Sequence, residues 1–352
     1  MPPAEGPNRD AVIRRSGDRL RCEPRHRQRQ TGMTRHHHIF SGLIDRARTF
    51  EPIAVAVVWP MSEPALCGAL EAARETLIRP VLFGPKDAIE GLAATLHLDL
   101  QGCDIADVGT EAEAAAAGVA LCRTGKAEAL MKGSLHTDHF MHTVMDDATG
   151  LKTHRRISHV FVLDVPSYPR MLLITDAAVN IYPTLLDKAD ITQNAIDLAK
   201  VLGIETPKVA ILSAVETVTP KIASTIDAAA LCKMADREQI AGGIVDGPLA
   251  FDNAVNLRAA RIKHIHSPVA GKADVLVVPD LESGNMLAKQ LEYLAEADAA
   301  GIVVGARVPI VLTSRADTAK ARLASCAVAV LMAHTRRTMG DGSAPRGLDH
   351  DG

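Results

Sequence analysis

Long apolar runs, aromatic side chains and an excess of one charge are all scarce in this chain of 352 residues. No stretch reaches the ~18 consecutive apolar residues that a membrane-spanning helix requires, and the N-terminus lacks an apolar signal segment. Aromatic residues make up 3% of the chain, and the formal net charge is −3. Stacking platforms and a basic surface are therefore not expected. We predict a cytoplasmic protein without nucleic-acid or membrane partners.

Metal and disulfide motifs are also missing. The six cysteines lie far apart without a C-x-x-C pair, which argues against a zinc knot or a disulfide framework and favours reduced thiols. The side chains of His36–His38 must diverge because the residues are adjacent. His136, His139 and His142 drift around a helix at their three-residue spacing. We expect no metal site and no tightly bound cofactor.

What the chain does contain is enough apolar sequence, 47%, for two α/β cores. Residues 1–35 differ, because arginine, proline and glutamine crowd them without apolar periodicity. We expect disorder there, with the natural start near Met33, and likewise in the tail 336–352.

Between these ends, strand and helix patterns alternate. This order predicts an α/β fold with a parallel sheet and right-handed crossovers. Strands are predicted at 53–58, 79–83, 129–132, 159–165, 170–175, 209–213, 243–246, 275–278 and 308–312. Helices are predicted at 63–76, 87–96, 111–123, 138–145, 190–202, 222–234, 253–262, 286–297 and 318–334.

The link between strands 159–165 and 170–175 is too short for a crossover, so these strands should form an antiparallel hairpin. We take it as the start of a second domain, 151–305, inserted into a first domain formed by 36–150 and 306–335. Turns from both domains would then face a cleft between them.

Two strand-to-helix turns carry the groups that would bind an anion. After strand 275–278, Asn285 stands where a helix N-cap would stand, so Ser283, Gly284 and Asn285 would offer backbone N–H groups at the positive end of a helix. Strand 308–312 likewise leads into Ser314 and Arg315. Together the turns indicate a site for a phosphorylated ligand.

Two further polar turns have alternative interpretations. Lys132, Gly133 and Ser134 suit a phosphate or pantetheine contact, or they solvate the end of a strand. Asp176 and Asn180 follow a buried strand and belong either to a site or to a local hydrogen-bonded turn.

Five motifs together resemble the phosphate acetyl/butyryl transferase family over about residues 38 to 335. They are ALMKGSLHT (129–137), LLITDAAVNIYPT (172–184), ILSAVETVTPKIASTIDA (211–228), SPVAGKADVLVVPDLESGN (267–285) and VPIVLTSRAD (308–317). The resemblance implies the two-domain α/β/α fold of the isocitrate and isopropylmalate dehydrogenases, with the active site in the cleft between domains, often in a homodimer. It also implies reversible acyl transfer between coenzyme A and inorganic phosphate, the two substrates.

The resemblance implies catalytic roles for the serine-arginine pair. Charge grows on the acyl carbonyl oxygen when a thiolate attacks acyl phosphate, and Ser314 would stabilise it while Arg315 holds the phosphate. This sequence departs from acetyl-type members in two places. Ala321 stands where they carry the presumed aspartate base, and KQLEYL (289–294) lacks their arginine. Asp317, the nearest carboxylate, is either a base or a helix cap, with the cap slightly favoured.

Two other functions remain open. The same fold serves metal- and NAD(P)-dependent hydroxyacid dehydrogenases, which would need a cluster of cleft aspartates that is not evident here. The missing aspartate leaves room for a non-catalytic protein that binds coenzyme A or acyl phosphate. The sequence does not fix the acyl length, because pocket walls come from distant residues.

Overall fold

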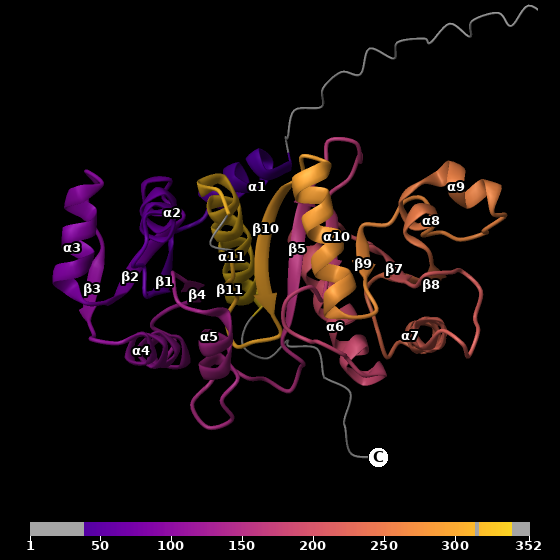
Figure 1. Ribbon diagram of the computed structural model, residues 1–352, viewed down its shortest axis with the longest axis horizontal. Coiled ribbons are helices and arrows are strands. Elements are labelled where there is room, and N and C mark those ends of the chain that lie inside the picture. The colour runs from indigo at the N-terminus through magenta and orange to yellow at the C-terminus, as the bar shows by residue number, and fades with distance from the viewer. Residues whose placement is uncertain (1–38, 314–316, 340–352) are drawn as a thin grey trace, which may run out of the picture. The chain divides into compact units, whose positions relative to one another are not determined.

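The computed structural model describes residues 39–313 and 317–339, which form an 11-stranded sheet with helices on both faces (Figure 1). The strands are β1 (Ile53–Val58), β2 (Ile78–Gly84), β3 (Asp104–Asp107), β4 (Ala129–Lys132), β5 (Ser158–Asp164), β6 (Leu172–Thr175), β7 (Lys208–Leu212), β8 (Ile244–Leu249), β9 (Val275–Val277), β10 (Asp298–Val304) and β11 (Ile310–Val311). The helices are α1 (Ile39–Arg48), α2 (Glu63–Arg74), α3 (Lys86–Thr95), α4 (Glu111–Arg123), α5 (Thr137–Val144), α6 (Leu185–Val201), α7 (Ala223–Asp236), α8 (Phe251–Val255), α9 (Leu257–Ile262), α10 (Leu281–Leu294) and α11 (Ala319–Met339). No helix within these ranges is long and apolar enough to span a bilayer.

The strand order is β3-β2-β1-β4-β11-β10-β5-β6-β9-β7-β8. Strands β3, β2, β1, β4 and β11 are mutually parallel, as predicted, and β6, β9, β7 and β8 form a second parallel set. Between them, β10 is antiparallel to both β11 and β5, and β5 is antiparallel to β6. The two parallel sets therefore run in opposite directions. The carboxyl ends of the first set lie at the same end of the sheet as the amino ends of the second set.

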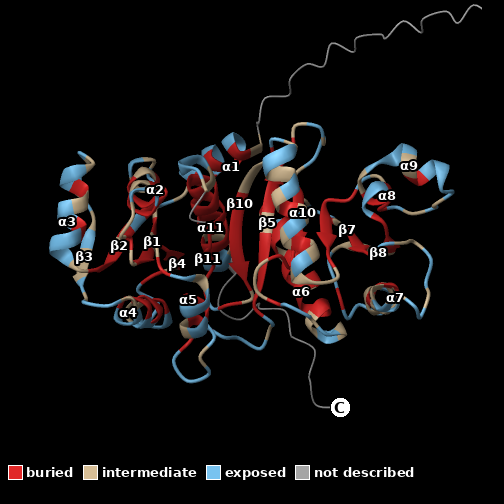
Figure 2. Cartoon of the chain, in the orientation of Figure 1, coloured by how far each residue is buried: buried red, intermediate tan, exposed pale blue. Residues whose placement is uncertain are grey.

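Three apolar clusters hold the helices to the sheet. Alternate residues of β1 show the division, because Val55 and Val57 face α1, α2 and α11 while Ala56 and Val58 face α4 and α5. Helices α6 and α7 share the first face, and α8, α9 and α10 pack on the other face of the second strand set. Figure 1 shows α2 and α4 on opposite sides of β1, and Figure 2 shows the buried residues concentrated in the strands.

The predicted hairpin is confirmed by the pairing of β5 with β6. The sequence analysis missed α1, the short strand β3 and the central strand β10. The residues of β3 alternate little in character, and β10 follows α10 after a gap of only three residues. The predicted helix 253–262 is two helices, because the Asn256 side chain caps α9 by accepting the N–H groups of Arg258 and Ala259. The helix predicted from Asp190 begins earlier, at Leu185, because Thr184 and Asp187 form a capping box.

The segment 1–35 lies outside the described residues. The tail was predicted to begin at Arg336, but α11 continues to Met339. The sheet order places the strands from 36–150 and 306–335 side by side, followed by all those from 151–305. The division into two domains stays a prediction.

Candidate functional site

The turn after β4 is fixed to the end of β1. The amide N and Oγ of Ser134 both donate to the Trp59 carbonyl at 2.9 Å. A Cβ on Gly133 would lie 2.3 Å from the same oxygen, so only glycine fits there. The ammonium of Lys132, which is buried, donates to the carbonyls of Gly133 at 3.1 Å and Leu135 at 3.0 Å. These three predicted residues thus form one rigid turn.

Ser314 and Arg315 lie outside the described residues, but both flanks of this pair are described. Thr313 follows β11 and is buried. On the other side Thr318 precedes α11, and its hydroxyl accepts the N–H of Ala321 at 3.2 Å. The Thr318 hydroxyl thus forms a cap bond of α11, and the two alternatives for Asp317, base or cap, both stay predictions.

Arg322 is a residue that the sequence analysis missed. Its side chain is 2% exposed, and Nη1 donates to Thr313 Oγ1 at 2.7 Å. Burial lowers the pKa of this guanidinium, and the Asp317 carboxylate opposes that shift. The available signal was an arginine on the otherwise apolar face of α11, since the residues around it are nearly all buried.

Helix α10 carries the predicted residues Gly284 and Asn285 near its start and Glu292 near its end. Near its end, burial foremost and then the charge of Asp317 raise the pKa of Glu292. Near its start, a Cβ on Gly284 would lie 2.7 Å from the Asp176 carbonyl oxygen, and Asn285 Nδ2 donates to the Ala177 carbonyl at 3.2 Å. The start of the helix is therefore held against the turn after β6.

The start of α10 was predicted wrongly. Asp280 is the N-cap, and its side chain accepts the Ser283 N–H at 2.8 Å and the Ser283 hydroxyl at 2.7 Å. The N–H of Gly284 donates to the Asp280 carbonyl at 3.2 Å. Asn285 lies inside the helix instead of capping it. The amides of Ser283 and Gly284 are therefore already hydrogen-bonded, because the aspartate starts the helix earlier.

The turn after β6 is closed by its own side chains. Asp176 accepts the backbone N–H groups of Ala178 at 2.9 Å, Val179 at 3.0 Å and Asn180 at 3.1 Å. The Asn180 side chain also donates to Asp176. Burial raises the pKa of Asp176, and these bonds oppose the shift. The predicted alternative of a local hydrogen-bonded turn describes these contacts.

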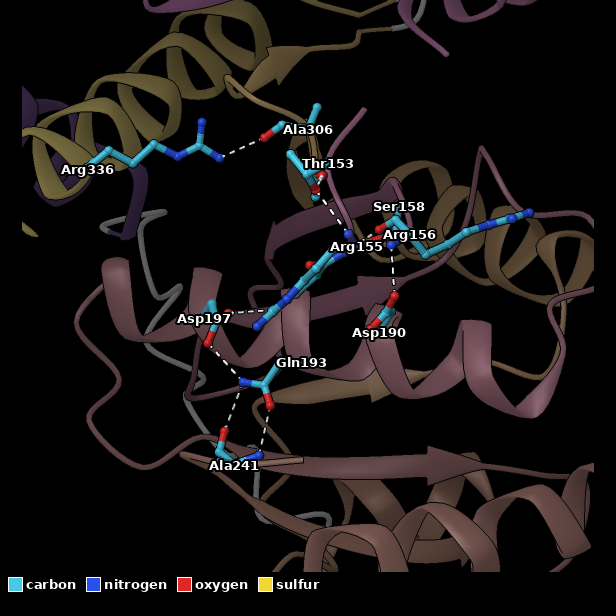
Figure 3. A network of polar contacts seen from close by, with 12 residues as sticks. Thr153, Arg155, Arg156, Ser158, Asp190, Gln193, Asp197, Ala241, Ala306 and Arg336 are labelled. Atoms are coloured by element: carbon cyan, nitrogen blue, oxygen red, sulfur yellow. Dashed lines mark hydrogen bonds and ion pairs between the residues drawn. The ribbon is translucent and has the colours of Figure 1, made fainter. Parts of the chain in front are cut away.

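Arg156, another residue that we did not predict, joins this turn to α6. Its Nε donates to Asn180 Oδ1 at 2.7 Å, and its backbone N donates to Asp190 at 2.9 Å. Figure 3 shows that contact with Asp190, together with the neighbouring ion pair of Arg155 and Asp197 at 2.8 Å. The chain entering β5 is thereby held to α6.

A pocket of about 340 Å³ lies where α5 meets the turn after β6. It is lined by Thr137, Asp138, Met141, His142, Met145, Ala178 and Val179. Because β4 and β6 run in opposite directions, the turns that follow them lie at opposite ends of the strands. Helix α5, which follows the first of these turns, nevertheless reaches the second turn at this pocket, so that residues of both predicted domains line it.

One buried histidine, His159 of β5, forms a hydrogen bond with the backbone of Leu312, which follows β11. Burial lowers the pKa of His159 to about 4, although a hydrogen bond with the Leu312 backbone opposes the shift. The imidazole is therefore neutral at pH 7. Within residues 39–313 and 317–339, no three or more His, Cys, Asp or Glu side chains are arranged to hold a metal ion.

Solved structures share this fold. A branched-chain phosphotransacylase from Enterococcus faecalis V583 is 30% identical and superposes with a TM-score of 0.69, covering 80% of this chain and 99% of its own. A 4-hydroxythreonine-4-phosphate dehydrogenase from Klebsiella pneumoniae, 12% identical, gives a TM-score of 0.50 over 80% of this chain and 98% of its own, a likeness of fold alone. The fold is that of the phosphotransacylases, shared with a dehydrogenase.

Sequence relatives narrow the class to a family. A match to the family described as phosphate acetyl/butaryl transferase covers residues 101–330. A phosphate acetyltransferase of Rhizobium meliloti is 61% identical over 298 residues, which are 85% of this chain and 94% of the relative. The chain belongs to the phosphate acetyl/butyryl transferase family of acyltransferases.

Proposed function

We propose that this protein transfers a short acyl group reversibly between coenzyme A and inorganic phosphate, by direct attack of the thiol on acyl phosphate. The thiolate sulfur forms a bond to the acyl carbon, the bond from that carbon to the phosphate oxygen breaks, and phosphate leaves. Acetyl is the first acyl group to test, because the relative that is 61% identical over 85% of the chain is named a phosphate acetyltransferase. This identity is the observation that carries the proposal.

Ser314 and Arg315 are the proposed catalytic pair, placed between the buried end of β11 and the start of α11. A hydroxyl at that point would stabilise charge on the acyl carbonyl oxygen, and a guanidinium fork would hold two oxygens of the departing phosphate. Interactions of this kind strengthen as charge develops in the transition state, so they accelerate the reaction.

Substrate would lie between the two predicted domains. The wall formed by Met141 and Met145 suits an apolar chain, and the pocket lies between α5, which follows the rigid turn 132–134, and the turn 176–180. Ser283, Gly284 and Asn285 would act through the turn that they support, because their contacts go to Asp280 and to residues 176–177. A homodimer in the cytoplasm completes the proposal.

Asp317 is the proposed base for the thiol, because it is the carboxylate nearest in the sequence to Ser314 on the side of α11. A thiol with a pKa of about 8.5 is only slightly ionised at neutral pH, so a base should accelerate the attack. We expect Asp317→Asn to lower kcat at pH 7 and to recover as the pH rises above about 8.5, where coenzyme A ionises unaided. Rate profiles from pH 6 to 9.5 would check this. A flat ratio of variant to parent across that range would contradict the role.

The reaction itself is tested by mixing acetyl phosphate with free coenzyme A and following the ultraviolet absorbance of the thioester, with butyryl phosphate in parallel. We expect turnover in both directions without added Mg²⁺ or NAD. Binding of coenzyme A without turnover of either acyl phosphate would instead identify a non-catalytic binding protein. Turnover that requires NAD and a divalent ion would identify a dehydrogenase.

A further inference from the structure

Arg156 braces a three-residue loop, 181–183, that links the turn after β6 to α6. Before the loop, Asn180 Oδ1 accepts a hydrogen bond from Nε of Arg156 at 2.7 Å. After the loop, one carboxylate oxygen of Asp187 lies 3.4 Å from the same Nε, and the other accepts the N–H and the hydroxyl of Thr184 at 2.9 and 2.8 Å. Both ends of the loop are therefore fixed relative to one guanidinium.

The loop presents two large apolar side chains to solvent. Tyr182 is 76% exposed and Ile181 is 59% exposed, whereas Asn180, directly before them, is buried. Pro183 has a fixed φ and disfavours helical backbone at Tyr182. A tyrosine on a braced loop loses little freedom when a flat ligand stacks on its ring, so less of the binding energy is spent on ordering.

The guanidinium of Arg156 keeps its two terminal nitrogens for a ligand. Both contacts of the side chain with the ends of the loop are made by Nε, and the side chain is 53% exposed. Neither Nη has a partner in the part of the chain that the structure describes. Figure 3 shows Arg155 and Arg156 extending to opposite sides of the chain, the first toward Asp197. A guanidinium that is held by Nε and offers both Nη groups can bind two oxygens of a phosphate group.

The pocket beside α5 directly precedes this loop along the chain. Val179 lines the pocket, and Asn180, the next residue, bonds to Arg156. Tyr182 follows two residues later. Along this segment the chain thus offers a pocket with an apolar wall, then a cation, then an exposed aromatic ring. Coenzyme A carries its parts in the same order, with a pantetheine arm, a pyrophosphate and an adenosine.

We propose that Arg156 and Tyr182 form the subsite for the adenosine diphosphate end of coenzyme A, with the guanidinium on the pyrophosphate and the tyrosine ring stacked on the adenine. This inference rests on the proposed use of coenzyme A. The pantetheine arm enters the pocket at Val179 and follows α5 toward the end of the sheet where β4 and β11 finish.

The deciding variant is Tyr182→Ala, which removes the ring and leaves the brace of the loop intact. Contacts far from the reacting atoms stabilise ground state and transition state equally, so they change KM and leave kcat unaltered. We expect KM for coenzyme A to rise about 5- to 100-fold, the range that stacking on one base supports. Tyr182→Phe should keep the parent KM, because the ring remains. The matched control is Tyr293→Ala on α10, which removes a tyrosine that is 62% exposed and should change neither constant.

The phosphate contact is tested with a second variant and a second thiol. Arg156→Met should raise KM about 10-fold for coenzyme A and equally for dephospho-coenzyme A, since both carry the pyrophosphate. A loss confined to coenzyme A would place the arginine on the 3′-phosphate and overturn the assignment. ADP should inhibit the parent in competition with coenzyme A and inhibit Tyr182→Ala more weakly. Inhibition that is not competitive would indicate a separate nucleotide site and would also overturn the proposal.

Failure of this inference differs from failure of the proposed function. Calorimetric titration with coenzyme A needs no turnover, and Tyr182→Ala should weaken the Kd by the same factor as KM. If that loss is found but no acyl phosphate is turned over, the subsite stands and the proposed function is wrong. If the parent is active and Tyr182→Ala matches it in both KM and Kd, the function stands and the subsite is overturned.

Discussion

The turn after β6 and the connection after β11 both bring polar side chains to the end of a buried strand, but they use them differently. In the first, Asp176 and Asn180 bond to each other and to the backbone between them. In the second, Thr313 is bonded by Arg322, a residue nine positions away on another element. The first turn is closed by its own side chains, whereas Thr313 at the start of the second connection is bonded by a side chain of α11.

This difference indicates different roles for the two turns, one structural and one catalytic. A carboxylate whose oxygens already accept several N–H groups has little capacity left for substrate. A connection held at its flanks can leave the groups between them available to react. We therefore expect the turn after β6 to shape the pocket through Ala178 and Val179, and the connection after β11 to carry the reaction.

The largest expected effect is at Ser314. We predict that Ser314→Ala lowers kcat by roughly 10²- to 10³-fold, as does loss of a single oxyanion donor elsewhere, with a much smaller change in KM. Steady-state kinetics with acetyl phosphate as the varied substrate would measure it. Unchanged turnover would show that the connection after β11 does not carry the reaction.

A selective loss is expected at Arg315. Arg315→Lys should weaken the use of phosphate and acyl phosphate by about 10-fold while sparing coenzyme A, because an ammonium cannot hold two oxygens as a guanidinium does. The comparison is between the KM values of the two substrates, measured in both directions. An equal loss for both would indicate a collapsed site or a coenzyme contact.

At Asp176 we expect a substitution to lower stability much more than activity. Asp176→Asn should lower the free energy of unfolding by about 1–3 kcal/mol, because an amide nitrogen replaces an acceptor that faces N–H groups, with far less effect on kcat than Ser314→Ala. Since burial raises the pKa of Asp176, folding favours its protonated form. The stability of the parent relative to the variant should therefore rise as the pH falls through that pKa. Urea unfolding at several pH values would test both statements.

The smallest effect is expected outside both turns. Deleting residues 1–32 should leave the melting temperature and specific activity unchanged, since that segment has no periodic apolar face to pack. A truncated protein that melts several degrees lower would show that the segment packs on the rest of the chain.

Local sequence patterns predicted most of the elements correctly. The parallel first strand set and the β5–β6 hairpin follow from apolar runs and a four-residue link, PSYP. Local patterns failed where two capping residues compete. Asp280 and Asn285 are both good caps, and the structure uses the earlier one, whose side chain accepts the Ser283 N–H.

The candidate site was less accessible to sequence reasoning. Lys132, Gly133 and Ser134 could be recognised as a polar turn, but their attachment to Trp59 depends on strand pairing. Arg322 carried no motif, and its side chain lies against Gly68, a residue distant in the chain. Contacts of this kind arise from helix packing, and no periodicity reveals them.

The sheet order also has a consequence for biosynthesis. Strand β11 lies between β4 and β10, but it is the last strand to be made. Until it emerges from the ribosome, the edge of β4 that it will cover remains open to pairing with another chain, a known route to aggregation. Closing that edge also delivers Thr313 and then α11 with Arg322. The last strand to be made therefore also completes the candidate site, so a chain that ends before β11 should be inactive.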